Sequence, residues 1–202
     1  MVSMWDRKYD RADYVYGTAP SRFLLEQAQW LTPGLRALSL ADGEGRNSVF
    51  LAQQGLDVTA VDSSGVALAK ARRLAGARSV PVTFIHADLR EWDWQPESYD
   101  LVVAIFIQFA EPALRDRIFK GMRRTLKPGG VLLLHGYTPR QLDFGTGGPS
   151  DAALLYTVEM LAEAFDGMAI ERLEAYEAEI DEGIGHSGRS ALIDLVARKP
   201  VG

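Results

Sequence analysis

The 202-residue chain has the length of one domain, so residues 1–202 are expected to form a single domain with a substantial core. Its formal net charge is −5 at pH 7, and Lys and Arg form no block longer than pairs, which argues against binding along a nucleic-acid backbone. Because the chain has no cysteine, a disulfide, a thiolate nucleophile and a cysteine-based metal site are excluded, and no metal is expected.

The apolar runs and the first residues predict the cellular location of the protein. The longest apolar runs, such as residues 99–110, are too short to cross a bilayer. The first 14 residues are charged and aromatic where a secretory signal would need an apolar centre. We therefore expect a cytoplasmic protein without a membrane or nucleic-acid partner, as a monomer or a homodimer.

The first two thirds of the chain alternate between strand and helix patterns. A helix is expected from about Pro20 to Leu31. Short runs of β-branched and apolar residues then predict five buried strands, at residues 37–41, 57–62, 82–87, 100–106 and 130–136. Amphipathic patterns predict three helices, at residues 46–54, 64–75 and 111–126. Gly55 and Gly76 are expected to end the first two, Pro112 to open the third, and residues 126–130 to make a tight turn into the fifth strand.

The pattern changes beyond the fifth strand. Residues 137–150 form a long Gly- and Pro-rich stretch without periodicity, which is expected to cover a substrate. A helix follows near residues 157–166, and two longer strands are expected at about 168–178 and 190–198. The whole pattern predicts an α/β fold: a doubly wound, Rossmann-like, seven-stranded sheet that is mostly parallel, with a C-terminal antiparallel hairpin.

The turn after the first strand, residues 41–48, has the features of a nucleotide site. Gly43 and Gly45 allow close approach of a ligand to the backbone, and the following helix presents unpaired N–H groups. Asp62 ends the second strand, where an acid typically accepts the hydroxyls of a ribose. Ser48 replaces the third glycine of the dinucleotide fingerprint, which argues against a nicotinamide-dependent oxidoreductase. A plain strand-to-helix turn is the alternative without a ligand.

Several segments together resemble the class I S-adenosylmethionine-dependent methyltransferases over nearly the whole chain. Within that class the chain resembles the branch of tellurite-resistance and thiopurine-type methyltransferases. The segments that carry the resemblance are WDRKYDRADYVYGTAPSRFL, GEGRNSVFLA, VTAVD, FGTGGP and DEGIGHSGRSAL. The resemblance implies S-adenosyl-L-methionine as cofactor and methyl transfer as reaction.

The family's cofactor residues carry over to positions at the ends of four strands. The resemblance implies that the glycine-rich turn wraps the methionine part of the cofactor, with Asp62 and Ser63 at the ribose. It also implies Asp88 and Leu89 at the adenine, with Ile105 closing the pocket from the fourth strand. The residues implied for the turn are Ala41, Asp42, Gly43 and Gly45. Ser39 and Ala41 depart from the family pattern, which more often has an acid and a glycine there.

The acceptor side is predicted from residues outside the cofactor motif. Residues 1–31 are expected to form a lid and a helix, with Tyr16 near the cofactor's sulfonium, where an aromatic face attracts a cation. His186 stands between Gly185 and Gly188 near the end of the chain, with Arg189 next to Gly188, and both are predicted to bind or activate the acceptor. His135, at the end of the fifth strand, could instead be a base or a core residue.

The predicted reaction is methyl transfer to a small molecule, with a thiol or a chalcogen oxyanion as candidate acceptors. Such acceptors need alignment rather than a strong base. The segment after the fourth strand, AIFIQFAEP, lacks the Asn/Asp-Pro-Pro-aromatic motif of many amino-methyltransferases. Two alternatives stay open: a non-catalytic module that binds S-adenosylmethionine, and an enzyme that methylates proteins.

Overall fold

A seven-stranded sheet forms the middle layer of the molecule. The computed structural model describes residues 3–201, and its strands follow the order β3-β2-β1-β4-β5-β7-β6. The first five strands are parallel, β7 runs antiparallel to β5, and β6 pairs antiparallel with β7 at one edge. The bounds are β1 Arg36–Leu40, β2 Asp57–Asp62, β3 Thr83–His86, β4 Tyr99–Ile105, β5 Leu126–Tyr137, β6 Ala169–Asp181 and β7 Ser187–Arg198. The predicted mostly parallel sheet with its C-terminal hairpin is confirmed.

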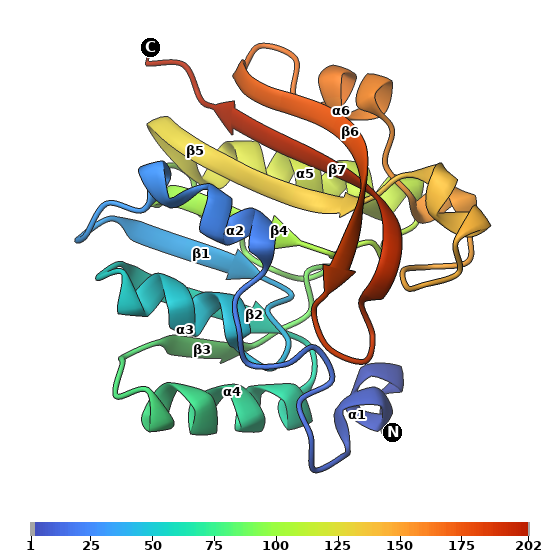
Figure 1. Cartoon of the computed structure of the whole chain (residues 1–202). Coiled ribbons are helices and arrows are strands. Elements are labelled where there is room, and N and C mark those ends of the chain that lie inside the picture. Colours follow the sequence, from blue (N-terminus) through green and yellow to red (C-terminus); the bar gives the residue numbers. More distant parts are fainter. Residues whose placement is uncertain (1–2, 202) are drawn as a thin grey trace.

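Helices cover both faces of this sheet (Figure 1). One face packs against α2 and α3, and the other packs against α5 and α6 through a larger apolar cluster. The helices are α1 Met4–Tyr9, α2 Arg22–Glu26, α3 Arg46–Gln53, α4 Gly65–Ala77, α5 Pro112–Thr125 and α6 Val158–Ala164. Because both faces are covered, the central strands are almost continuously buried, as their apolar sequences predict. Among residues 3–201, no helix is both long and apolar enough to cross a membrane.

Local chemistry explains where several helices begin. The Ser64 hydroxyl accepts the Ala67 N–H at 3.1 Å and caps α4, and Thr157 caps α6 in the same way. Helix α3 begins after Gly45, which has no side chain for capping. The Asp42 carboxylate, three residues earlier, accepts the Ser48 N–H at 3.2 Å instead. The turn before α3 therefore depends on Asp42 as well as on its glycines.

The structure corrects three of the predicted elements and adds a fourth. The expected helix from Pro20 to Leu31 is the short α2 followed by a 3-10 turn at Ala28–Trp30. Gly76 lies inside α4, which continues to Ala77, because a helix tolerates glycine at a modest entropic cost. Residues 126–130 belong to β5 rather than to a turn before it. Helix α1 was not predicted, although Ser3 and Asp6 form a capping box that is visible in the sequence.

The glycines of α3 and α4 provide a matched test of this packing. Gly45 has φ +91°, and a Cβ there would lie 2.7 Å from the Ala71 Cβ of α4. We expect Gly45→Ala to lower the free energy of unfolding by about 2–4 kcal/mol, because strain and overpacking add. A Cβ at Gly76 would have no atom within 4 Å, so Gly76→Ala should raise the free energy of unfolding by about 0.5–1 kcal/mol. Urea unfolding followed by circular dichroism measures both, and a Gly45→Ala protein as stable as the parent would contradict the packing argument.

Candidate functional site

A cavity of about 580 Å³ lies at the carboxyl ends of β1, β2 and β4. This is the edge at which doubly wound sheets bind ligands, and the volume is typical of a small-molecule site. The structure brings ten of the twelve predicted site residues to its wall. They are Tyr16, Ala41, Asp42, Gly43, Asp62, Ser63, Asp88, Leu89, Ile105 and His186. The other two, Gly45 and Arg189, are not among the lining residues.

The glycine-rich turn is held in a sharp conformation by its own acid. Ala41, Gly43 and Gly45 have φ values of 46°, 62° and 91°, so every second residue is left-handed. Asp42 is buried between them and accepts the Ser39 hydroxyl at 2.6 Å and the Ser48 hydroxyl at 2.5 Å. Desolvation raises the pKa of Asp42, against these hydrogen bonds. The carboxylate that Ser39 lacks is therefore supplied from Asp42, three residues later.

Asp62 joins the end of β2 to the glycine-rich turn. One oxygen accepts the Gly43 N–H at 2.8 Å, and the other accepts the Ser64 N–H at 2.7 Å. Burial raises the pKa of Asp62 to about 6, although both backbone hydrogen bonds lower it. A carboxylate that lines the cavity and is fixed at both oxygens can accept the hydroxyls of a ribose, so this end of the cavity fits the sugar of an adenosine.

Asp88 occupies a more open position beyond β3. Arg90 binds it through Nε at 3.0 Å to both oxygens, and this pairing lowers the pKa of Asp88. Leu89 is buried beside it, and Ile105 lines the cavity from the end of β4. The mixture of a charged rim and apolar walls fits a flat base such as adenine.

The N-terminal segment forms an aromatic roof over the turn. Trp5, Tyr9 and Tyr16 all line the cavity, with Tyr9 6.1 Å from Trp5 and 6.3 Å from Tyr16 between ring centroids. A Cβ at Gly43 would lie 2.8 Å from the Tyr9 hydroxyl, so the lack of a side chain at Gly43 lets the roof close. Such rings attract a sulfonium. Sequence reasoning missed Tyr9, because nothing local distinguishes it from a packing residue.

A buried ion pair anchors this roof. Glu44 accepts the Val15 N–H at 2.7 Å and pairs with Lys70 of α4. The Lys70 ammonium also donates to the Asp13 carbonyl at 2.7 Å. Both charged side chains are 2% exposed. Because these charges have lost water, separating the pair would be costly, and residues 13–15 are held firmly to α4.

His186 lies in the β6–β7 turn, where aromatic rings surround it. Its ring centroid is 4.4 Å from that of Tyr16 and 4.1 Å from that of Phe106. Burial, with smaller contributions from Arg46 and Lys8, lowers the pKa of His186 to about 2. Its Nδ1 has no hydrogen-bond partner. His186 is therefore neutral at pH 7.

Arg189 and residues 137–150 lie outside the cavity. The Arg189 guanidinium is 63% exposed and donates to Glu177 at 2.7 Å. No residue of 137–150 lines the cavity, and Gly147 instead forms a β-bridge with His186. The structure thus places neither at the cavity wall. Arg189 lies on the surface of the hairpin, and Thr146 and Gly147 of the long stretch contact the hairpin.

His135 lies apart from this cavity. Its Nδ1 is 2.7 Å from the buried Asp194, and its ring stacks on Phe23 at 4.9 Å. It borders a separate hollow of about 220 Å³ on the α2 side of the sheet. His135 lies near the end of β5, as expected; its ring also contacts Phe106, which lines the main cavity, but His135 itself does not line that cavity.

An ion pair that the sequence did not reveal closes the cavity wall. Arg46, the first residue of α3, donates to Glu182 at 2.7 Å, and both side chains are 8% exposed. Glu182 also accepts the Arg22 N–H at 2.9 Å. Arg46 and Glu182 are 136 residues apart, so no local signal could have paired them.

Comparison with known proteins finds methyltransferase sequences similar to this chain. Residues 37–130 match the methyltransferase domain family. An uncharacterized methyltransferase of Synechocystis sp. is 32% identical over 106 residues, covering 52% of this chain and 48% of that protein. A carboxy-S-adenosyl-L-methionine synthase of Geobacter metallireducens is 32% identical over 141 residues, covering 66% and 57%. The chain thus spans about half the length of these curated relatives.

Solved structures show the same fold over a larger share of the chain. TehB from Haemophilus influenzae superposes with a TM-score of 0.73 at 21% identity, covering 96% of this chain and 65% of TehB. A protein studied for converting a disulfide bond into a thioacetal group during echinomycin biosynthesis superposes with a TM-score of 0.80 at 19% identity. The superposition covers 100% of this chain and 93% of that protein. Residues 37–130 thus match a methyltransferase domain, these similarities indicate S-adenosyl-L-methionine as its cofactor, and the solved structures share the fold.

Proposed function

We propose that the chain transfers a methyl group from S-adenosylmethionine to a small-molecule acceptor, with a thiol or a chalcogen oxyanion as the candidate classes. The observation that carries this proposal is one cavity that joins an adenosine-type end to an aromatic end. The first contains Gly43, Asp62 and Leu89, and the second contains Tyr16 and His186. Its volume suits two small molecules rather than a folded protein surface.

The proposed role of this chain's residues is positioning. The cofactor supplies an electrophilic methyl on a sulfonium. Asp62 and the turn at Gly43 would hold the nucleoside and the methionine portion, while Tyr9 and Tyr16 face the positive charge and exclude water. Alignment of two reactants can contribute several kcal/mol without a base, which suits a soft acceptor. Asp88 is proposed at the adenine and Ile105 as an apolar wall.

We further place the chain in the tellurite-resistance and thiopurine-type branch. The supporting observations are the segments at residues 43–52 and 181–192 and the structural similarity to TehB. The similarity at 21% identity supports the fold, so the branch rests mainly on the sequence segments.

Release of S-adenosylhomocysteine tests the proposed reaction. Purified protein is incubated with S-adenosylmethionine and a panel of thiols, chalcogen oxyanions, amines and carboxylates, and the product is measured by mass spectrometry. We expect release with at least one small-molecule acceptor. Calorimetric binding of the cofactor without release for any acceptor would favour a non-catalytic binding module, and methylation of added protein alone would favour a protein methyltransferase.

Asp62 makes cofactor binding dependent on pH. Its pKa of about 6 in the folded protein lies above the ordinary 3.8, so the stability linked to this group is complete below pH 3.8 and is lost as pH rises through 6. Ribose binding favours the ionised form. We therefore expect cofactor affinity to fall as pH decreases from 7 to 5, because a proton must then leave Asp62 on binding.

The Asp62→Asn variant tests this linkage by calorimetry. At pH 7.5 it should bind S-adenosylhomocysteine about 10- to 100-fold more weakly, because charged hydrogen bonds to the ribose are lost. It should also lose the dependence on pH between 5 and 7. Asp88→Asn is the matched control for the dependence on pH. Arg90 lowers the pKa of Asp88, so the Asp88 carboxyl does not titrate between pH 5 and 7. Normal affinity in Asp62→Asn would refute the assignment of Asp62.

A further inference from the structure

The aromatic end of the cavity holds no unpaired cation. Among the described residues that line the cavity, Arg46 and Arg90 are the only cations, and each is paired, with Glu182 and with Asp88. Lys8 lies 5.0 Å from the Tyr16 ring but is exposed and does not line the cavity. Of the five lining acids, Glu44 and Asp88 are likewise paired, with Lys70 and Arg90, whereas Asp42, Asp62 and Glu111 have no ion-pair partner among the described residues. The surroundings therefore attract a sulfonium and repel an anion.

One polar group at this end is unsatisfied. The Nδ1 atom of His186 has no partner, although the residue is only 6% exposed and its ring is enclosed by Tyr16 and Phe106. A buried polar atom without a partner is rare in native proteins because its desolvation is not compensated. His186 lines the cavity, so its neutral imidazole gives this end a polar wall without a charge.

We propose that the acceptor compartment, bounded by Tyr16, Phe106, His186 and Arg46, binds an uncharged acceptor against the neutral imidazole of His186 and rejects anionic ones, because Glu182 neutralises Arg46 from behind the cavity wall. This inference rests on the proposed methyl transfer and chooses between its two acceptor classes, favouring an uncharged thiol over a chalcogen oxyanion. Transfer breaks the bond from sulfonium sulfur to methyl carbon and forms one from the thiol sulfur to that carbon. The thiol proton passes to solvent water.

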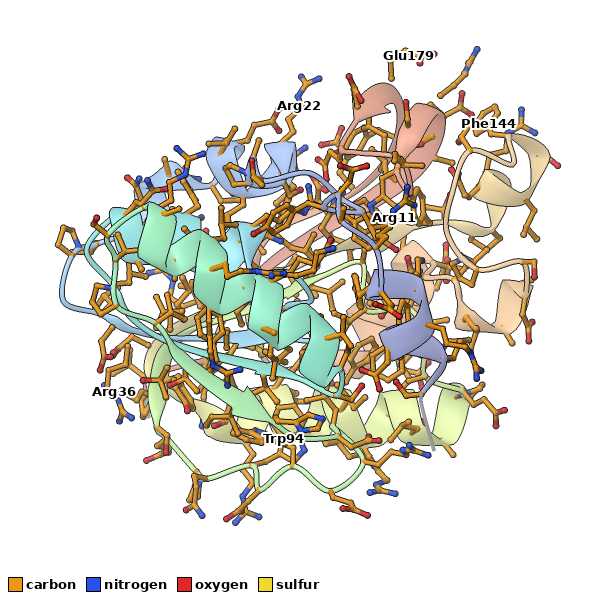
Figure 2. The ribbon with its side chains drawn as sticks, turned by 90° about the horizontal axis from the view of Figure 1, so that it is seen from below. Arg11, Arg22, Arg36, Trp94, Phe144 and Glu179 are labelled. Atoms are coloured by element: carbon orange, nitrogen blue, oxygen red, sulfur yellow. The ribbon has the colours of Figure 1, made fainter. Side chains whose placement is uncertain are left out.

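Glu182 is the residue that sets this specificity. It cancels the charge of Arg46 while its other oxygen accepts the Arg22 N–H and the Ser21 hydroxyl. In Glu182→Gln the amide oxygen can keep the two latter contacts, whereas the amide nitrogen cannot pair with a guanidinium. The variant therefore leaves the cation of Arg46 free in the compartment. Glu179→Gln removes the same charge from the exposed outer surface of the same hairpin and is the matched control (Figure 2).

Calorimetry on protein saturated with S-adenosylhomocysteine tests the proposal at pH 7.5. The probes are 4-(mercaptomethyl)benzamide and 4-(mercaptomethyl)benzoic acid, which match in shape and differ in charge. We expect the amide to bind about tenfold or more tightly than the acid, because the paired compartment does not compensate a carboxylate. Glu182→Gln should reduce this preference by about tenfold, and Glu179→Gln should leave it unchanged. His186→Phe should weaken binding of the amide about fivefold or more while S-adenosylhomocysteine still binds normally.

Three results would overturn the inference: equal or tighter binding of the acid, binding of neither probe, or the same effect from both glutamate variants. The proposed function is judged separately, from release of S-adenosylhomocysteine when the cofactor replaces its product. Should the amide bind with the expected preference but no acceptor on the panel be methylated, methyl transfer fails while the charge preference of the compartment stands.

Discussion

Three side chains of the glycine-rich turn hold distant segments over one edge of the sheet, and the cavity depends on them. Glu44 binds Val15 and Lys70, and Arg46 binds Glu182. The side-chain oxygen Oδ1 of Asn47 accepts the Ser21 N–H at 2.9 Å. The segment that contacts the cofactor end thereby positions the roof, the C-terminal hairpin and the start of α2. A disturbance of this turn would therefore loosen the proposed acceptor compartment as well.

Burying these charges is expensive, which bears on why they are present. Two charged groups removed from water recover the desolvation cost only with good geometry and further hydrogen bonds, and an apolar pair of similar volume is often as stable. Glu44 and Lys70 meet that condition through Val15 and Asp13. Their benefit is a unique arrangement of the roof. The Arg46–Glu182 pair has a second consequence, because it neutralises the Arg46 cation at the wall of the cavity.

The two ends of the cavity differed in how well they could be predicted. Asp62 and the turn at Gly43 follow directly from a strand-helix-strand pattern, because parallel strands bring their carboxyl ends to one edge. Arg189 was predicted because it follows His186 by three residues, yet side chains alternate between faces along β7, and Arg189 lies on the surface. The protonation state of His186 could not be predicted from the sequence either, since its pKa is lowered by burial and by charges that are distant in the chain.

The sequence by itself determined the alternation of strands and helices, the mostly parallel sheet with its terminal hairpin, and the edge of the sheet at which the cavity lies. Those properties depend on periodicity and on residues near each other in the chain. Only the tertiary structure decided that Tyr9 closes over Gly43, that Asp42 supplies the carboxylate missing at Ser39, and that Glu182 neutralises Arg46. Apart from the local bond between Ser39 and Asp42, these contacts join distant segments, and burial sets the charge state of the groups involved.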